Sequence, residues 1–318
     1  MSAAELLAPI TARMRLPLVA APMFTVSGVD LVVAACRSGV VGAFPTANCR
    51  TSDELDAWLS AMRERLADSD SAPAPVAPNL IVHASNTRLA DDLEVVLRHR
   101  PELVITSVGS PAPVLGPLHD AGALVLADVA TIRHAERAVA AGADGLVLLT
   151  AGAGGQTGWL NPFAFVRAVR AFYDGPLVLA GGITDGRALH AAIALGCDLA
   201  YMGTRFIATR ESLAGAAYRQ MLVDSTADDV VLTAAFTGLP SSILRPSIAA
   251  AGLDPDDLPV HGAVDVSSDL DAGAAERRPV RWRDIWSAGH SVSGVTSVQT
   301  VEELVQTTYE EYVAARST

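Results

Sequence analysis

Lysine is absent from this chain of 318 residues, and all 23 of its basic residues are arginine. Catalysis through a Schiff base, as in many aldolases, is excluded because it needs a lysine amine. A nucleotide-binding P-loop is excluded as well, because its lysine reaches the bound phosphates. Both classes of protein can be set aside from composition alone.

Long apolar runs and cysteines are scarce too. No stretch reaches the length of about 18 apolar residues that suggests a membrane-spanning helix. The start of the chain, MSAAELLAPI, lacks the basic residues and apolar core of a secretory signal. Cys36, Cys49 and Cys197 are too few and too scattered to indicate a disulfide framework or a metal site. We therefore expect a protein of the reducing cytoplasm.

The net charge and the spacing of the histidines exclude further classes of binding partner. The net charge of −12 argues against nucleic acid and against an anionic membrane surface. Neither an H-x-H nor an H-E-x-x-H spacing occurs, and His83, Asp128 and His134 are scattered, so no metal site is expected. The expected partner is a small-molecule substrate. The oligomeric state stays open, with a homodimer as one candidate.

Short apolar runs recur along the first two thirds of the chain, and a helical pattern follows most of them. Each run is long enough for a buried strand and too short for a buried helix. The expected strands are 18–23, 40–44, 79–83, 103–106, 124–128, 146–149, 177–180 and 199–202. The expected helices between them are 29–37, 51–66, 89–99, 111–121, 132–141, 162–172 and 187–195. This α/β alternation requires a parallel sheet, and eight units favour a closed (β/α)8 TIM barrel over an open sheet.

The alternation stops after residue 208. We assign residues 1–208 to the barrel and 209–300 to a small, mostly helical lid over its top. The segment 254–278 within the lid is acidic, rich in glycine and alanine, and aperiodic. Residues 301–318 are expected to form a C-terminal helix that docks on the barrel.

Glycine-bearing loops follow the last three expected strands, at 152–155, 181–182 and 203–204. Without a Cβ, glycine lets backbone N–H groups approach an anion closely. In such barrels the loops after strands 7 and 8 form the usual phosphate site. Tight turns would explain one such loop, but two in succession favour a phosphate site.

Six motifs extend over nearly the whole chain. They are AAPM at 20–23, Asn79-Leu80, AGAGGQTG at 151–158, AGGITDGR at 180–187, MGTRFIATRES at 202–212 and WSAG at 286–289. Their order resembles the nitronate monooxygenase family, formerly called 2-nitropropane dioxygenase. The resemblance implies a TIM barrel, non-covalently bound FMN and oxidation of alkyl nitronates by O2. Related flavin barrels reduce enoyl thioesters or quinones with NAD(P)H.

The resemblance also implies which residues contact the cofactor. Residues 21–23 would line the flavin ring, Asn79 would hydrogen-bond the ring or the ribityl chain, and the glycine loops would hold the phosphate. The full set of implied contacts is Ala21, Pro22, Met23, Asn79, Asp128, Gly155, Gln156, Ala180, Gly181, Gly182, Met202, Gly203 and Thr204. Tyr201, in the last expected strand, is interpreted as a core residue.

The catalytic residues depart from the family pattern. The family loop commonly reads AGGHxG, with histidine as catalytic acid or base, and Gln156 stands at that position. An amide can orient a substrate but cannot take its proton. Asp128 stands where many members carry a lysine, and either a base or a helix cap fits it. His83 and His290 are the other candidates for the missing base, with core or surface roles as their alternatives.

Three functions follow. The leading one is an FMN-dependent oxidoreductase that oxidises alkyl nitronates with O2. The alternative is an NAD(P)H-dependent flavin reductase of enoyl thioesters or quinones. The third is a flavin-free barrel enzyme that acts on a phosphorylated metabolite.

Overall fold

Parallel strands close into a barrel in the computed structural model, which describes residues 2–69, 71–236, 238–258 and 284–317. The strand order is β1-β2-β3-β4-β5-β6-β8-β9. The barrel closes because β1 (Leu18–Ala20) pairs with β2 (Val41–Pro45) on one side and with β9 (Leu199–Met202) on the other. The predicted TIM barrel is thereby confirmed.

The barrel strands form at the short apolar runs. The remaining ones are β3 (Val76–Ile81), β4 (Leu103–Ser107), β5 (Leu124–Val129), β6 (Gly145–Leu149) and β8 (Leu177–Ala180). β1 is shorter than expected, because Pro22 has no N–H with which to continue the ladder. β3 begins at Val76 rather than Asn79, since Pro78 is accommodated within the strand beside Phe44.

Helices cover the outside of the barrel. They are α2 (Val29–Arg37), α3 (Ser52–Ala67), α4 (Leu89–His99), α5 (Ala112–Asp120), α6 (Ile132–Ala141), α7 (Pro162–Arg170) and α8 (Gly186–Leu195). The hydroxyl of Thr51 accepts a hydrogen bond from the N–H of Glu54 at 3.1 Å, which caps α3. An additional helix, α1 (Ala3–Thr11), precedes β1. Within the described residues, no helix is long and apolar enough to span a membrane.

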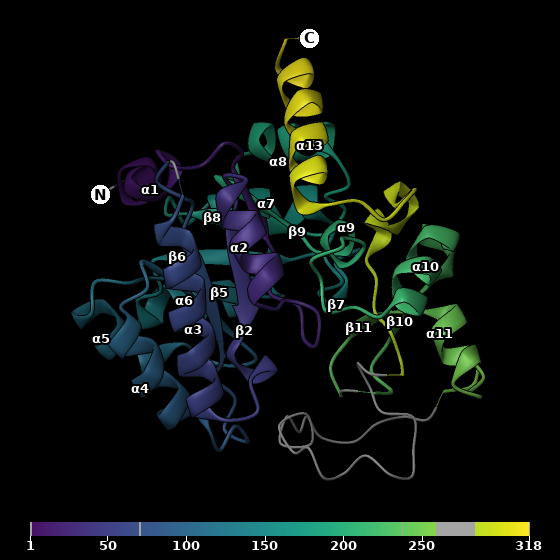
Figure 1. Cartoon of the computed structure of the whole chain (residues 1–318), viewed down its shortest axis with the longest axis horizontal. Helices are drawn as coiled ribbons and strands as arrows, with labels where there is room; N and C mark the ends of the chain where they lie inside the picture. The colour runs from purple at the N-terminus through teal and green to yellow at the C-terminus, as the bar shows by residue number, and fades with distance from the viewer. Residues whose placement is uncertain (1, 70, 237, 259–283, 318) are drawn as a thin grey trace.

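The end of the chain supplies the eighth outer helix. Directly after β9 comes only the single turn α9 (Thr204–Ile207). The C-terminal helix α13 (Val301–Arg316) packs against α8 and α2, the helices of the seventh and first units (Figure 1). It occupies the position of the missing helix, so the segment between α9 and α13 is an insertion between the last strand and its helix.

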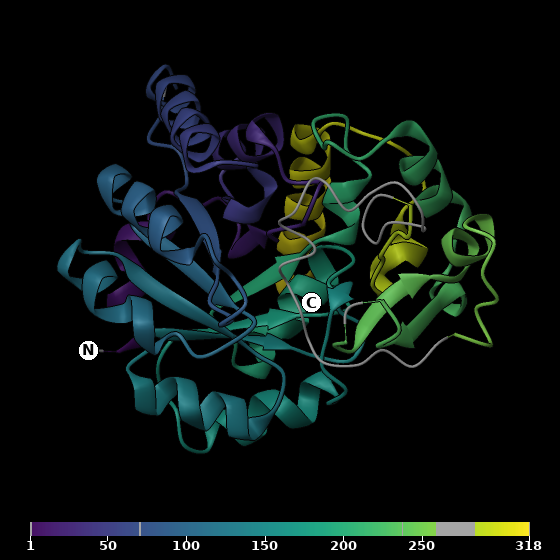
Figure 2. The same ribbon diagram turned by 90° about the horizontal axis from the view of Figure 1, so that it is seen from below.

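The described residues of the inserted segment form a small lobe beside the barrel (Figure 2). It contains α10 (Ala216–Asp224), β10 (Val230–Thr233), β11 (Ser241–Leu244), α11 (Arg245–Ala250) and the 3₁₀ helices η2 (Ala227–Asp229) and η3 (His290–Gly294). Helices predominate among its described residues, but β11 pairs antiparallel with β10 and with β7 (Gly155–Gln156), which follows barrel strand β6. Residues 259–278 of the acidic stretch lie outside the described residues. The proposed domain bounds stay a prediction.

The barrel interior changes from apolar to polar along the strands. Ala77, Ile105, Leu126 and Leu199 belong to the packed interior layer. Because side chains alternate along a strand, the residues two positions further also point inward. These residues are Asn79, Ser107, Asp128 and Tyr201. The sequence thus places four polar groups at the C-terminal end of the barrel, where such barrels carry their active sites.

Candidate active site

A cavity lies at the C-terminal ends of the barrel strands, where loops of several units meet the inserted lobe. Its walls come from the loops after β1, β6, β8 and β9, from α10 and β11, and from the segment around η3. Every residue expected to contact the cofactor lines this cavity except Met202. Residues from distant parts of the chain are therefore brought together around one space.

Met202 supports the cavity from outside. Its side chain is buried in the layer between the strands and the helices. Its carbonyl oxygen accepts a hydrogen bond from the N–H of Ala21 at 3.0 Å. Met202 therefore fixes the start of the β1 loop, and its side chain does not reach the cavity.

The glycine loops after β8 and β9 lie at neighbouring edges of the cavity. Gly181 and Gly182 have positive φ angles of +128° and +72°, a region that favours glycine. A Cβ on Gly182 would meet no atom within 4 Å, so this side of the backbone is open. Gly203 and Thr204 line the cavity beside them. This geometry suits a cradle of backbone N–H groups for an anion.

Gly154, in the loop after β6, serves backbone packing instead. A Cβ on Gly154 would lie 2.7 Å from the backbone nitrogen of Gly289, and a Cβ on Gly289 would lie 2.5 Å from the carbonyl oxygen of Gly152. The N–H of His290 donates to that same carbonyl at 2.9 Å. The β6 loop and the WSAG segment are therefore joined backbone to backbone, and both line the cavity.

Gln156 lies in β7, where it pairs with Ser241 of β11. The N–H of the adjacent Thr157 donates to the carbonyl of Pro240 at 3.0 Å. These contacts fix the backbone, and the half-buried Gln156 lines the cavity. Its amide can donate and accept hydrogen bonds there but cannot take up a proton.

The two candidate histidines lie outside the cavity lining. Nδ1 of His83 is 2.8 Å from Oγ of Ser85 and accepts from the N–H of that residue at 3.2 Å, so this nitrogen is engaged in the loop after β3. His290 is exposed, and its ring lies against Gly152. In the part of the chain that the structure describes, no histidine lines the cavity.

The cavity floor carries polar atoms that find no hydrogen-bond partner among the described residues. They are Nδ2 of Asn79, Oδ1 of Asp128 and the hydroxyl of Tyr201. The side-chain oxygen of Asn79 is satisfied, because it accepts from the hydroxyl of Ser107 at 3.1 Å. An unsatisfied buried polar group costs about 1–3 kcal/mol. Several of them on one cavity therefore indicate a ligand that satisfies them.

Asp128 is a neutral acid under ordinary conditions. Burial raises its pKa to about 8, so the carboxyl is protonated at neutral pH. Burial, and then the nearby charge of Asp128, raise the pKa of Tyr201. The hydroxyl of Thr131 caps α6 by accepting from the N–H of His134 at 3.0 Å, which leaves Asp128 without a capping role.

A comparison with protein families identifies the chain. The family model described as nitronate monooxygenase matches residues 8–311. The chain belongs to the nitronate monooxygenase family. It is therefore a flavin-dependent oxidoreductase, and the flavin-free alternative no longer applies.

Individual relatives carry several activities. A nitronate monooxygenase of Paraburkholderia phytofirmans is 29% identical over 282 residues, which cover 75% of this chain and 76% of that protein. A (3aS,4S,5R,7aS)-5-hydroxy-7a-methyl-1-oxo-octahydro-1H-indene-4-carboxyl-CoA dehydrogenase of Mycobacterium tuberculosis is 29% identical over 232 residues, which cover 72% of this chain but only 63% of that protein. The structure of a nitroalkane oxidase from Streptomyces ansochromogenes superimposes with a TM-score of 0.78 at 26% identity, and covers 96% of this chain and 98% of that one.

The residues of this family member fit a flavin. The open backbone at Gly182 has room for a phosphate. The unpartnered polar atoms of Asn79, Asp128 and Tyr201 suit a ring with hydrogen-bonding atoms along its edge. Both features border one cavity, so one ligand can reach both.

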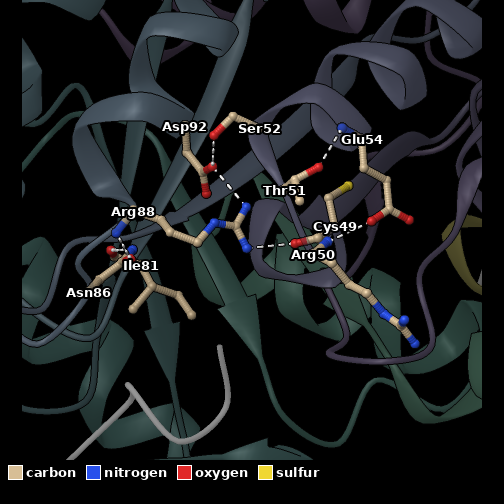
Figure 3. A network of polar contacts seen from close by, with 9 residues as sticks. All are labelled: Cys49, Arg50, Thr51, Ser52, Glu54, Ile81, Asn86, Arg88 and Asp92. Atoms are coloured by element: carbon tan, nitrogen blue, oxygen red, sulfur yellow. Dashed lines mark hydrogen bonds and ion pairs between the residues drawn. The ribbon is translucent and has the colours of Figure 1, made fainter. Parts of the chain in front are cut away.

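An ion pair between half-buried Arg88 and buried Asp92 holds the wall beside β3 (Figure 3). Nη2 of Arg88 donates to the carboxylate of Asp92 at 2.9 Å, and Nη1 donates to the carbonyl of Cys49 at 2.6 Å. Nδ2 of Asn86 donates to the carbonyl of Ile81 at 2.7 Å. Because Ile81 lines the cavity, this network supports the site from behind.

Arg88→Ala should lower the free energy of unfolding by about 3–5 kcal/mol, because it removes the cationic partner of the buried Asp92 carboxylate and leaves it the hydroxyl of Ser52 at 3.4 Å. Urea unfolding measures the loss. Arg65→Ala is the control, since its ion pair with Asp30 is exposed and should contribute at most about 1 kcal/mol. Equal effects of the two substitutions would show that the Arg88 network is dispensable.

Some lining residues were not predicted from the sequence. Tyr201, interpreted as a core residue, has its hydroxyl at the cavity floor. Tyr201 lies two residues beyond Leu199, at the C-terminal end of a barrel strand. This inward position could have predicted a residue of the active site. Tyr218 and Ser287 also line the cavity, and the hydroxyl of Tyr218 donates to the carbonyl of Ser287 at 2.5 Å. No local pattern links these two residues, which lie far apart in the sequence.

Proposed function

We propose that this chain binds FMN and oxidises alkyl nitronates with O2. When bound, the flavin supplies the redox chemistry by taking electrons from the substrate and passing them to O2. The residues that would hold its phosphate are Gly181, Gly182, Gly203 and Thr204. The residues that would border its ring and ribityl chain are Ala21, Pro22, Met23, Asn79, Asp128, Gly155 and Ala180.

Gly182→Leu should expel the flavin. The leucine side chain would enter the space proposed for the phosphate, and the φ of +72° would be strained. We expect the purified variant to lose most of its flavin absorbance. Gly122→Leu is the matched control, because Gly122 has a φ of +86° and open space around it but lies between α5 and β5, outside the cavity lining. Full flavin content in Gly182→Leu would argue against the proposed phosphate site.

The lack of a base in the cavity favours a nitronate as substrate. No histidine lines the cavity within the described ranges, and the only lining carboxyl there, Asp128, is protonated at neutral pH. A nitronate has already lost its α-proton, so its oxidation needs no base. This observation carries the proposal, because the site is equipped to orient and oxidise an anion but not to make one.

Neutral hydrogen-bond donors can receive the nitronate oxygens. Gln156 lines the cavity with its amide. Oγ of Ser287 also lines it and is buried without a hydrogen-bond partner among the described residues. We propose that these two groups orient the substrate, with the apolar wall beside them contacting the alkyl part.

Anaerobic reduction of the bound flavin tests the proposed activity. An alkyl nitronate, NADH and NADPH are mixed separately with the flavin-loaded protein, and the flavin absorbance is followed. We expect bleaching by the nitronate and reoxidation when O2 is admitted. Bleaching by a nicotinamide alone, with no response to the nitronate, would contradict the proposal.

The second candidate is an NAD(P)H-dependent reductase of enoyl thioesters or quinones. The observation in its favour is the similarity to the carboxyl-CoA dehydrogenase of Mycobacterium tuberculosis, whose name specifies a CoA thioester. The same anaerobic experiment separates the two functions. A flavin reduced by NADH or NADPH and reoxidised by an enoyl thioester or a quinone would establish this alternative.

A further inference from the structure

Asp128 and Tyr201 are placed together on the cavity floor by the barrel itself. They occupy inward positions of β5 and β9, directly beyond the buried Leu126 and Leu199. Tyr201 is only 6% exposed, yet its hydroxyl has no partner among the described residues, and the same holds for Oδ1 of Asp128. Because the barrel core is packed beneath them, both groups can be satisfied only from the cavity.

The surroundings of the pair contain no compensating charge. Among the described residues that line the cavity from every neighbouring strand and loop, there is no arginine, histidine, glutamate or second aspartate. The only other titratable lining group is Tyr218, whose hydroxyl already donates to the carbonyl of Ser287. An ionised Asp128 would therefore be a buried charge without a counterion, which is strongly unfavourable.

The protonation state of Asp128 determines whether its carboxyl can donate a hydrogen bond to a ligand on the cavity floor. A neutral carboxyl and a phenol each have one O–H to donate, and the free Nδ2 of Asn79 can only donate. Three donors suit the N1–C2=O side of the flavin pyrimidine ring, where a ring nitrogen and a carbonyl oxygen both accept, whereas the neighbouring N3–H is a donor. An ionised carboxylate can only accept, so it would repel the N1–C2=O side.

From this arrangement we propose that protonated Asp128 and Tyr201 form a donor pair that binds the acceptor edge of the flavin ring. Flavin binding then requires the proton on Asp128, and the affinity for flavin depends on pH. The inference rests on the proposed binding of FMN and adds to it a ring-binding residue, Tyr201, and a protonation requirement.

Flavin dissociation constants measured from about pH 7 to pH 9.5 test the pair. Riboflavin is the principal probe, because it lacks the phosphate of FMN, which has its own ionisation near pH 6. The riboflavin dissociation constant should rise by up to about ten-fold per pH unit above about pH 8, since only the protonated fraction binds. Asp128→Asn, which is neutral and can donate at every pH, should bind riboflavin with a constant that does not change over this range.

Substitution of the phenol separates the two members of the pair. Tyr201→Phe removes one donor and should weaken riboflavin binding by about three- to ten-fold at neutral pH. Tyr309→Phe, on α13 and outside the cavity lining, is the matched control and should leave binding unchanged. Circular dichroism verifies that each variant is folded.

The outcomes distinguish this inference from the proposed function. If FMN and riboflavin bind but Asp128→Asn shows the same rise with pH as the unmodified protein, the protonation requirement is wrong. If Tyr201→Phe binds riboflavin as tightly as the unmodified protein, Tyr201 does not contact the ring. If FMN fails to bind at any pH, the proposed function fails, and the donor pair fails with it.

Discussion

Neutral nitroalkanes are expected to react about 10²–10⁴-fold more slowly than their nitronates with the unmodified protein. A neutral nitroalkane must lose its α-proton before it can be oxidised, whereas a nitronate has already lost it. Gln156 stands where the family resemblance places a histidine, and an amide cannot accept that proton. Asp128 is protonated at neutral pH, so it cannot replace the histidine there. The loss of a positioned base is the cause of the expected contrast.

Steady-state rates with freshly dissolved nitroalkane and with the preformed nitronate, both near neutral pH, measure this contrast. Gln156→His should raise the nitroalkane rate and leave the nitronate rate similar, because it restores a base at the cavity wall. Gln156→Asn keeps an amide and is the matched control. Rapid turnover of the neutral nitroalkane by the unmodified protein would reveal another base, and alanine substitutions at His83, Asp128 and His290 would then identify it.

The barrel was predictable because each of its strands is a short apolar run bounded by loop residues. The pattern is local, so α2, α4 and α6 have the predicted bounds and the strands differ only at their ends. The sheet of the inserted lobe was not predictable in this way. β7 is two residues long and is a strand only because β11, from a distant part of the chain, pairs with it. Such an element has no sequence pattern of its own.

The candidate site was predictable where backbone geometry determines it and not where loops direct side chains. Gly182 lies in the loop directly after β8, where the chain turns sharply, and its positive φ angle favours glycine. His83 ends an expected strand and His290 follows the WSAG motif, but neither lines the cavity. His83 contacts Ser85, and the ring of His290 lies against Gly152. For Tyr201 the prediction was wrong in the other direction. An aromatic side chain in an apolar run suggests a core residue, but Tyr201 lines the cavity. Only the alternation of inward positions along β9 distinguishes it.

Asp128 should make the flavin-free protein less stable as the pH rises from about 4 to about 8, and Asp128→Asn should remove this contribution to the pH dependence. In the folded state burial raises the pKa of Asp128 to about 8, from an ordinary value of 3.8. Between these two pH values the folded protein holds a proton that the unfolded chain has released. Stability is therefore greatest below the lower value and is lost as the pH rises through the higher one. One proton changes the free energy of unfolding by at most about 1.4 kcal/mol per pH unit. Water in the cavity makes the loss smaller than this limit.

Urea unfolding of flavin-free protein at several pH values measures the slope. Asparagine has nearly the same shape and no charge to bury, so Asp128→Asn should be the more stable protein at pH 8, by several kcal/mol in order of magnitude. Asp174→Asn, which changes an exposed aspartate, is the control and should leave the slope unchanged. If Asp128→Asn has the same slope as the unmodified protein, Asp128 is ionised in the folded state. The cavity would then contain a base, and neutral nitroalkanes would become substrates after all.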